Sequence, residues 1–297
     1  MRDSEIWRAA LDGTNPRRIA AGHSPAISPD GRWIAYLRVE WTPRSVAEEI
    51  RVMPTLGGSS RVLRHEEGRR GLFGQPIWSP DSRSLVVSGT DGLLAIEPES
   101  GDTTVLQRRR EGSNPGVASF SPDGTELAFD VSDSTGADVY VLSLPSGALR
   151  RLTDDGQSAG PVWGPRGIAF ARHTLRGNGD IWLMDGNGKR KRRLTRTSAG
   201  IQPFAFSDDG RRLLAFNPAI HNGRLWAVDV ERGESRDLTG WVGDLFPLGL
   251  SRDGSRILAR VGCGALIRQS GSVERISFAN GKKRTLAEGP CVASWNA

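Results

Sequence analysis

Ser121-Pro122-Asp123-Gly124 is one copy of a unit that repeats along this chain. Close copies are Ser28-Pro29-Asp30-Gly31 and Ser79-Pro80-Asp81-Ser82, and looser ones occupy residues 164–167, 207–210 and 251–254. An apolar residue precedes each copy and a further one stands near the chain end, giving the anchors Ile27, Trp78, Phe120, Trp163, Phe206, Leu250 and Trp295. Successive anchors are 51, 42, 43, 43, 44 and 45 residues apart, so the chain consists of repeats.

A second feature lies between these turns. The segment Asp180-Ile181-Trp182-Leu183 leads through a polar turn to Arg193-Leu194-Thr195, as in a hairpin. The first and the closing apolar residues are 13 positions apart in seven copies: Ile6 and Ile19, Ile50 and Leu63, Leu93 and Leu106, Val139 and Leu152, Ile181 and Leu194, Leu225 and Leu238, Val273 and Leu286. This constant spacing predicts a hairpin of the same length in every repeat.

Each repeat therefore holds four short strands. The first strand precedes the Ser-Pro-Asp-Gly turn, the second follows it, and the hairpin supplies the third and fourth. In the turn, proline presets φ, aspartate bonds to its own backbone and glycine accepts a positive φ. Four strands in about 43 residues are typical of a β-propeller blade. The tryptophans at repeated positions are expected to pack between blades rather than to stack on a ligand; they are Trp7, Trp78, Trp163, Trp182, Trp226 and Trp295.

A count of strands predicts an all-β, seven-bladed propeller of four-stranded antiparallel blades, as a single domain over residues 1–297. The pattern contains seven first strands and seven hairpins but only six second strands. We expect residues 5–20 and 291–297 to share the closing blade, which lacks one strand. The missing strand would precede Met1, so we also expect that Met1 is not the natural start and that an export signal has been lost.

The motifs Ile77-Trp78-Ser79-Pro80-Asp81 and Arg150-Arg151-Leu152-Thr153 resemble the TolB-type repeat, also called the WD40-like or PD40 repeat. The resemblance covers nearly the whole chain. It implies a propeller of the kind found in periplasmic scaffold proteins, in surface proteins, and in prolyl-oligopeptidase-like and tricorn-like peptidases. It covers the propeller of TolB but not the smaller N-terminal domain of that protein, so it does not imply a Tol–Pal role.

Charge does not point to a nucleic-acid partner. The net charge is +6, and the positive charge is almost all arginine and scattered along the chain. The densest run, 189–193, falls in an outer hairpin, where alternate side chains point to opposite sides, and no aromatic residues are interleaved with it. No apolar run reaches 18 residues, so no membrane span is expected.

No convincing catalytic set is present, and no cofactor is expected. Gly156-Gln157-Ser158-Ala159-Gly160 matches the nucleophile-elbow pattern, but it falls in a loop between two blades rather than on a strand-turn-helix. We expect its glycines to serve the loop.

The four histidines are predicted in loops of one face. His23 and His65 are placed in loops before first strands, and His173 and His221 are placed after second strands of different blades. A metal site, as in families resembling oligogalacturonate lyase, is the alternative to exposed loop histidines.

Cys263 and Cys291 map to one face of neighbouring blades. A disulfide between them would fit an oxidising compartment, and two unrelated buried thiols are the alternative.

These observations favour a monomeric, non-enzymatic scaffold, periplasmic or extracellular, that binds a protein, peptide or glycan. The segment Arg38–Glu48, with Trp41, is predicted to be a long loop and a candidate contact point. The alternatives are a metal-dependent propeller lyase and the gating domain of a prolyl-oligopeptidase-like peptidase.

Overall fold

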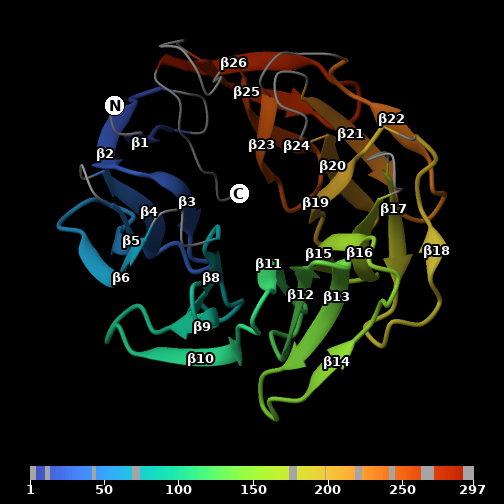
Figure 1. Cartoon of the computed structure of the whole chain (residues 1–297). Coiled ribbons are helices and arrows are strands. Elements are labelled where there is room, and N and C mark those ends of the chain that lie inside the picture. The colour runs from blue at the N-terminus through green and yellow to red at the C-terminus, as the bar shows by residue number, and fades with distance from the viewer. Residues whose placement is uncertain are drawn as a thin grey trace.

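The computed structural model describes residues 5–10, 14–41, 45–68, 74–173, 179–197, 199–217, 223–240, 245–261 and 271–289. These residues form only strands and turns, arranged as six four-stranded antiparallel sheets and one two-stranded sheet. Viewed down its axis, the molecule is a ring of blades, with β3, β11, β15, β19 and β23 nearest the centre and β6, β10, β14, β18, β22 and β26 at the rim (Figure 1). The fold is therefore an all-β propeller.

The blades follow the chain in order, and each one runs from its inner to its outer strand. Blade 1 comprises β3 (His23–Ile27), β4 (Trp33–Trp41), β5 (Val46–Pro54) and β6 (Arg61–Gly68). Blade 2 comprises β7 (Ile77–Trp78), β8 (Leu85–Gly89), β9 (Gly92–Ile96) and β10 (Thr103–Arg108). Blade 3 comprises β11 (Asn114–Phe120), β12 (Glu126–Asp133), β13 (Gly136–Ser143) and β14 (Leu149–Arg151).

The other half of the ring has the same plan. Blade 4 comprises β15 (Ser158–Gly164), β16 (Gly167–His173), β17 (Gly179–Met184) and β18 (Arg192–Arg193). Blade 5 comprises β19 (Gln202–Phe206), β20 (Arg212–Asn217), β21 (Arg224–Asp229) and β22 (Ser235–Asp237). Blade 6 comprises β23 (Leu245–Leu250), β24 (Arg256–Val261), β25 (Gly271–Ser277) and β26 (Lys283–Gly289).

The prediction of seven blades is wrong: the part of the chain that the structure describes forms six four-stranded blades. The seventh hairpin exists as β1 (Glu5–Arg8) and β2 (Arg17–Ala21), but it forms a sheet of two strands. The 13-residue spacing identifies only the third and fourth strands of a repeat, so a count of hairpins does not by itself give a count of four-stranded blades. The strand expected at 291–297 lies outside the described residues. Ile6 of this hairpin packs against Ile34, Tyr36 and Met53 of blade 1.

The repeated turn has the predicted chemistry. In five copies the serine hydroxyl donates to the aspartate carboxylate and accepts the backbone N–H of the residue five positions after the serine. The pairs are Ser28–Asp30, Ser79–Asp81, Ser121–Asp123, Ser207–Asp209 and Ser251–Asp253. The aspartate carboxylate in turn accepts the backbone N–H of the residue two positions after the aspartate. Gly124 has a φ of +72°, which L side chains rarely adopt.

The core lies between blades rather than inside them. Leu37, Ile50 and Leu63 of blade 1 form one cluster with Trp78 and Leu94 of blade 2, and each later pair of neighbours shares a similar cluster. This is expected because a sheet buries its apolar faces only against another element. The predicted interblade packing is confirmed for four tryptophans, which are Trp78, Trp163, Trp182 and Trp226.

The inner strands share an irregularity. In β3, β11, β15, β19 and β23 the pairing with the second strand shifts register, and a proline lies at each shift: Pro25, Pro115, Pro161, Pro203 and Pro247. Inner strands are sheet edges, so a proline there removes no hydrogen bond of the ladder.

Candidate functional site

The loops between blades, and the turns between second and third strands, emerge on the face of the disc opposite the Ser-x-Asp turns, because the strands alternate in direction. We call the first the loop face and the second the turn face. In blade 3 the loop face presents the turn 133–136 and the loop 152–157. Loops held by a rigid scaffold are where propellers carry function, so this face is the candidate site.

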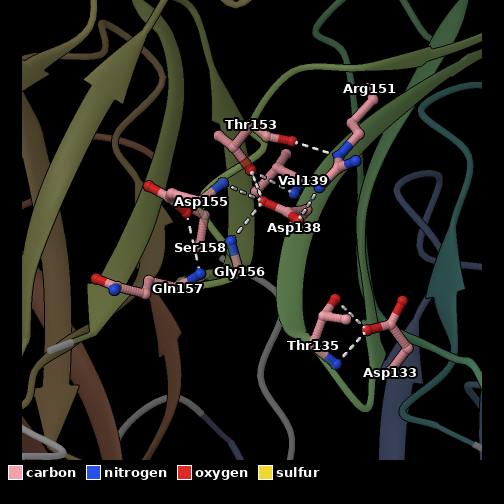
Figure 2. Close-up of polar contacts among 10 residues, drawn as sticks. All are labelled: Asp133, Thr135, Asp138, Val139, Arg151, Thr153, Asp155, Gly156, Gln157 and Ser158. Atoms are coloured by element: carbon pink, nitrogen blue, oxygen red, sulfur yellow. Dashed lines mark hydrogen bonds and ion pairs between the residues drawn. The ribbon is translucent and has the colours of Figure 1, made fainter. Parts of the chain in front are cut away.

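A buried carboxylate organises the loop 152–157 (Figure 2). Asp138 Oδ1 accepts the Thr153 hydroxyl at 2.9 Å, Asp155 N–H at 3.1 Å and Gly156 N–H at 3.2 Å. Its Oδ2 accepts Arg151 Nη2 at 2.6 Å, and the Asp138 side chain is only 7% exposed. The hydrogen bond to Asp138 raises the pKa of Arg151. Asp138 thus fixes the course of the loop and holds the Arg151 guanidinium beside it.

The same arrangement recurs in blade 4. Asp180 accepts the Thr195 hydroxyl and the Thr197 N–H, both at 2.8 Å, and it pairs with Arg193. Burial raises the pKa of Asp180, but hydrogen bonds from Thr197, Arg193 and Thr195 outweigh it and hold the pKa below 3.8. The loop that follows β18 is therefore anchored as its counterpart in blade 3 is.

Blade 5 has the pair with its signs exchanged. Arg224 occupies the position of Asp138 and Asp180, and Asp237 occupies the position of their arginines, with 3.2 Å between Arg224 Nη1 and Asp237 Oδ2. Asp237 Oδ1 accepts the N–H groups of Thr239 and Gly240. The loop is again held by a carboxylate, now from the fourth strand. The two members of each pair are 13 residues apart, as are the apolar residues of the hairpins. The sequence pattern does not reveal the pairs because the acidic and the basic residue exchange places in blade 5.

A second carboxylate ties the loop 152–157 to blade 4. Asp155 accepts Gln157 N–H at 3.0 Å, the Ser158 hydroxyl at 2.9 Å and Arg172 Nε at 2.7 Å. Burial raises the pKa of Asp155, and the bonds from Gln157, Ser158 and Arg172 together hold it below 3.8. Arg172 lies 5.1 Å from the centre of the Trp182 ring. Two backbone hydrogen bonds also hold this loop: Ala137 N–H donates to Gly156 O, and His173 N–H donates to Gln157 O.

These contacts account for the G-x-S-x-G match. Ser158 is fully buried at the start of β15, and its hydroxyl donates to Asp155. A fully buried hydroxyl has no access to substrate, and the carboxylate that accepts its proton is a weak base because its pKa is lowered. Gly156 has a φ of +64°, so the expectation that it serves the loop is confirmed, whereas Gly160, with a φ of +59°, lies within β15.

The predicted histidine placement is partly wrong. His23 is the first residue of β3, and His65 lies inside β6, so these two share blade 1 instead of occupying loops of different blades. His23 Nε2 lies 3.5 Å from Glu48, and His65 Nδ1 lies 3.7 Å from Glu49. His173 ends β16, and burial lowers its pKa. His221 lies outside the described residues. Among the residues that the structure describes, no group of three His, Cys, Asp or Glu side chains is placed to hold a metal ion.

The other predicted features fare differently. Cys263 and Cys291 both lie outside the described residues, so their disulfide stays a prediction. In the basic run, Arg192 donates to Val230 O and Arg193 pairs with Asp180, which divides the charge. The segment Arg38–Glu48 is not a loop insertion: β4 and β5 pair through it as far as Trp41 and Val46. It belongs to an extension of blade 1, in which β4 and β5 each have nine residues.

Comparison with known proteins identifies the family of the chain. A family model described as the TolB beta propeller domain, PD40, matches residues 2–246. The chain belongs to the TolB β-propeller family. The predicted resemblance is confirmed.

Relatives of this TolB-family propeller are larger proteins. TolB of the Tol-Pal system from Anaeromyxobacter dehalogenans is 34% identical over 112 residues, which is 36% of this chain and 24% of that protein. Tricorn protease homolog 1 from Streptomyces coelicolor is 28% identical over 233 residues, 72% of this chain and 21% of that protein. The matches thus span about a quarter of the curated relatives' length.

Solved structures agree on the fold of the TolB-family propeller. Oligogalacturonate lyase from Vibrio parahaemolyticus gives a TM-score of 0.68 at 13% identity, covering 97% of this chain and 85% of the lyase. TolB from Acinetobacter baumannii gives 0.65 at 22% identity, covering 88% of this chain and 64% of that one. At these identities the likeness concerns architecture alone. Within the described ranges, no helix is long and apolar enough to cross a membrane.

Proposed function

We propose that this propeller is a non-enzymatic scaffold that binds a protein, peptide or glycan through its loop face, in the periplasm or outside the cell. The observation that carries the proposal is the anchoring of successive loops by Asp138, Asp180 and Asp237. Anchored loops lose little conformational entropy on binding, so they favour recognition. The match to TolB of the Tol-Pal system supports a scaffold role.

The loop face of blade 3 offers polar groups for recognition. Asp133, Ser134, Thr135 and Asp154 are exposed. The Thr135 side chain and backbone both donate to Asp133, and these bonds hold the pKa of Asp133 below 3.8. The carboxylate is therefore ionised at neutral pH and already oriented. Such a surface suits a polar partner that supplies hydrogen-bond donors.

A pair of matched variants tests which face binds. Ser134→Arg with Asp154→Arg places two bulky cations on the loop face, whereas Ser146→Arg with Asp102→Arg makes the same changes on exposed residues of the turn face. Tagged proteins are expressed in the native host, cross-linked and analysed by mass spectrometry. We expect the loop-face variant to lose partners that the wild type and the turn-face variant retain. Equal recovery from both variants would show that the loop face is not the binding surface.

Trp41 at the end of the blade 1 extension remains a proposed second contact point. Deleting Arg38–Glu48 would remove paired strand residues, so a single Trp41→Ala change is the better probe. Loss of a cross-linked partner with an unchanged melting temperature would support the contact, and unchanged cross-linking would exclude it. Cell fractionation of the natural gene product tests the proposed location, and light scattering tests the proposed monomer.

A peptidase gating domain is the second candidate, because the match to Tricorn protease homolog 1 covers 72% of this chain. An in-frame hydrolase domain in the same natural gene would favour it. The lyase alternative has only the shared architecture behind it. Release of unsaturated oligogalacturonides with added manganese would favour that alternative over the scaffold.

A further inference from the structure

The turn face carries an uneven distribution of charge. Each blade has two turns there, one between its first and second strands and one between its third and fourth. Counted with one strand residue at each end, these turns contain twelve lysines and arginines against seven aspartates and glutamates in blades 4 to 6, but three against seven in blades 1 to 3. All twelve cations are exposed, and we call them the basic sector; they lie within 164–167, 184–192, 206–212, 229–235, 250–256 and 277–283.

These cations are scattered along the sequence but are neighbours in the fold. Blades 4, 5 and 6 follow one another around the ring, so their turns form one continuous part of the turn face (Figure 1). Hydrogen bonds tie the turns across the blade boundaries: Arg192 Nη2 donates to Val230 O at 2.5 Å, and Asp208 N–H donates to Arg252 O at 2.8 Å. The basic sector is therefore one fixed patch rather than a set of independent turns.

The protein does not neutralise the basic sector itself. Within the described ranges none of its twelve cations forms an ion pair, whereas Arg32, in the other half of the turn face, pairs with Glu99 at 3.7 Å. Two carboxylates of the same turns, Asp209 and Asp253, each accept a serine hydroxyl and a backbone N–H of their own turn. The excess of cations therefore gives this half of the face a positive potential toward solvent.

The turn face suits the headgroup layer of a bilayer better than a nucleic acid. Single strands are held by stacking their bases on aromatic rings, and no aromatic side chain is exposed in the six segments of the basic sector. A duplex groove is read by a helix or a β-ribbon, and these segments are short turns. On the same face, between β5 and β6, Leu56 is 83% exposed and is the most exposed large apolar side chain of the described residues. Cations and an apolar side chain on one face are what an interfacial membrane contact uses.

We propose that the basic sector docks on an anionic phospholipid surface, with its cations among the headgroup phosphates. Charge complementarity carries this assignment, since each lysine or arginine near such a surface raises the affinity about fivefold. A propeller docked in this way holds its loop face away from the membrane, where a partner can reach it. The inference concerns the opposite face from the proposed partner site, so the two can fail separately.

Vesicle co-sedimentation with the full chain tests the proposal. The probe is a vesicle of about one third phosphatidylglycerol and two thirds phosphatidylcholine, and a vesicle of phosphatidylcholine alone is the matched surface without charge. We expect saturable binding to the anionic vesicles at about 50 mM salt and none to the neutral ones. Binding should be lost at about 500 mM salt, because screening shortens the range of the attraction.

Two triple variants with the same change in net charge locate the contact. The basic-sector variant should bind the anionic vesicles about 100-fold more weakly; it combines Lys189→Gln, Lys191→Gln and Lys282→Gln. The control should bind as the wild type does and changes three exposed cations of the loop face, Arg108→Gln, Arg110→Gln and Arg196→Gln. Leu56→Ser leaves the charge unchanged and should weaken binding about threefold, since it removes apolar surface from the contact.

Three results would overturn the assignment. The first is no co-sedimentation of the wild type with the anionic vesicles at about 50 mM salt. The second is an equal loss of binding in the two triple variants, which would make net charge, not the basic sector, the cause. The third is displacement from the vesicles by a DNA duplex at an equal concentration of phosphate, which would identify nucleic acid as the partner of this face.

Discussion

Replacing Asp138 gives the strongest test of how the loop face is built. In Asp138→Ala, the Thr153 hydroxyl and the N–H groups of Asp155 and Gly156 lose their acceptor in a site where the carboxylate is 7% exposed. Three such bonds, partly replaced by water, should cost about 3 kcal/mol of unfolding free energy. Asp138→Asn keeps an acceptor for the loop but turns an NH2 donor instead of an acceptor toward Arg151, which is 48% exposed and can turn to water, so about 1 kcal/mol is expected.

Urea denaturation at neutral pH measures both changes. The control is Glu126→Gln, which breaks the 2.6 Å pair with Arg150 in the same blade, where the side chains are 28% and 36% exposed. That surface pair should contribute about 0.5 kcal/mol. Amide exchange at Asp155 and Gly156 should also accelerate in Asp138→Ala. If Asp138→Ala costs no more than Glu126→Gln, Asp138 does not anchor the loop and the account of the loop face is wrong.

Three further predictions concern the repeat. Gly164→Ser restores the consensus turn residue, yet the added Cβ would lie 2.3 Å from the Phe206 ring, so urea denaturation should show a loss of about 1–2 kcal/mol, and a gain would contradict the packing. Trp78→Phe removes the indole bond to Ala26 O across blades 1 and 2 and should cost about 1 kcal/mol in the same assay; an unchanged midpoint would show that this bond is dispensable. The turn aspartates, of which Asp123 is typical, have pKa values held below 3.8 first by a serine hydroxyl; their folded pKa lies below the unfolded one, so their contribution is complete above about pH 4 and lost as pH falls through the folded values. At pH values under about 4, the melting temperature should therefore decrease as the pH is lowered. The decrease should be less steep in Ser121→Ala, and an equal dependence of melting temperature on pH in the two proteins would refute the assignment.

The repeat made most strands predictable, because turn chemistry and alternation are local properties. Blade number was not predictable in the same way: the 13-residue spacing identifies a hairpin at Ile6 and Ile19, but a hairpin does not report which strands lie inside it. His65 was misplaced because Arg61–Gly68 is largely polar, and only pairing with the long β5 keeps it a strand up to the loop face. Polar strand ends of this kind look like loops in a sequence.

The candidate site was less predictable than the fold. The Asp138–Arg151 pair and the reversed Arg224–Asp237 pair do the same work with opposite residues, so no residue pattern is shared between them. Arg109, in the loop after β10, and Tyr140 of β13 line the same shallow surface depression, although they are far apart in the sequence. Only the packing of neighbouring blades creates that combination.

The prolines on the inner strands limit what can pair with the inner edges of the blades. Each one removes an N–H group from such an edge, and each register shift bends that edge out of line. An extended peptide laid along an inner edge would therefore find no continuous ladder to join, and neither would an edge strand of a neighbouring molecule. Recognition at these edges has to act through side chains, and the same prolines protect five sheet edges against amyloid-like strand pairing.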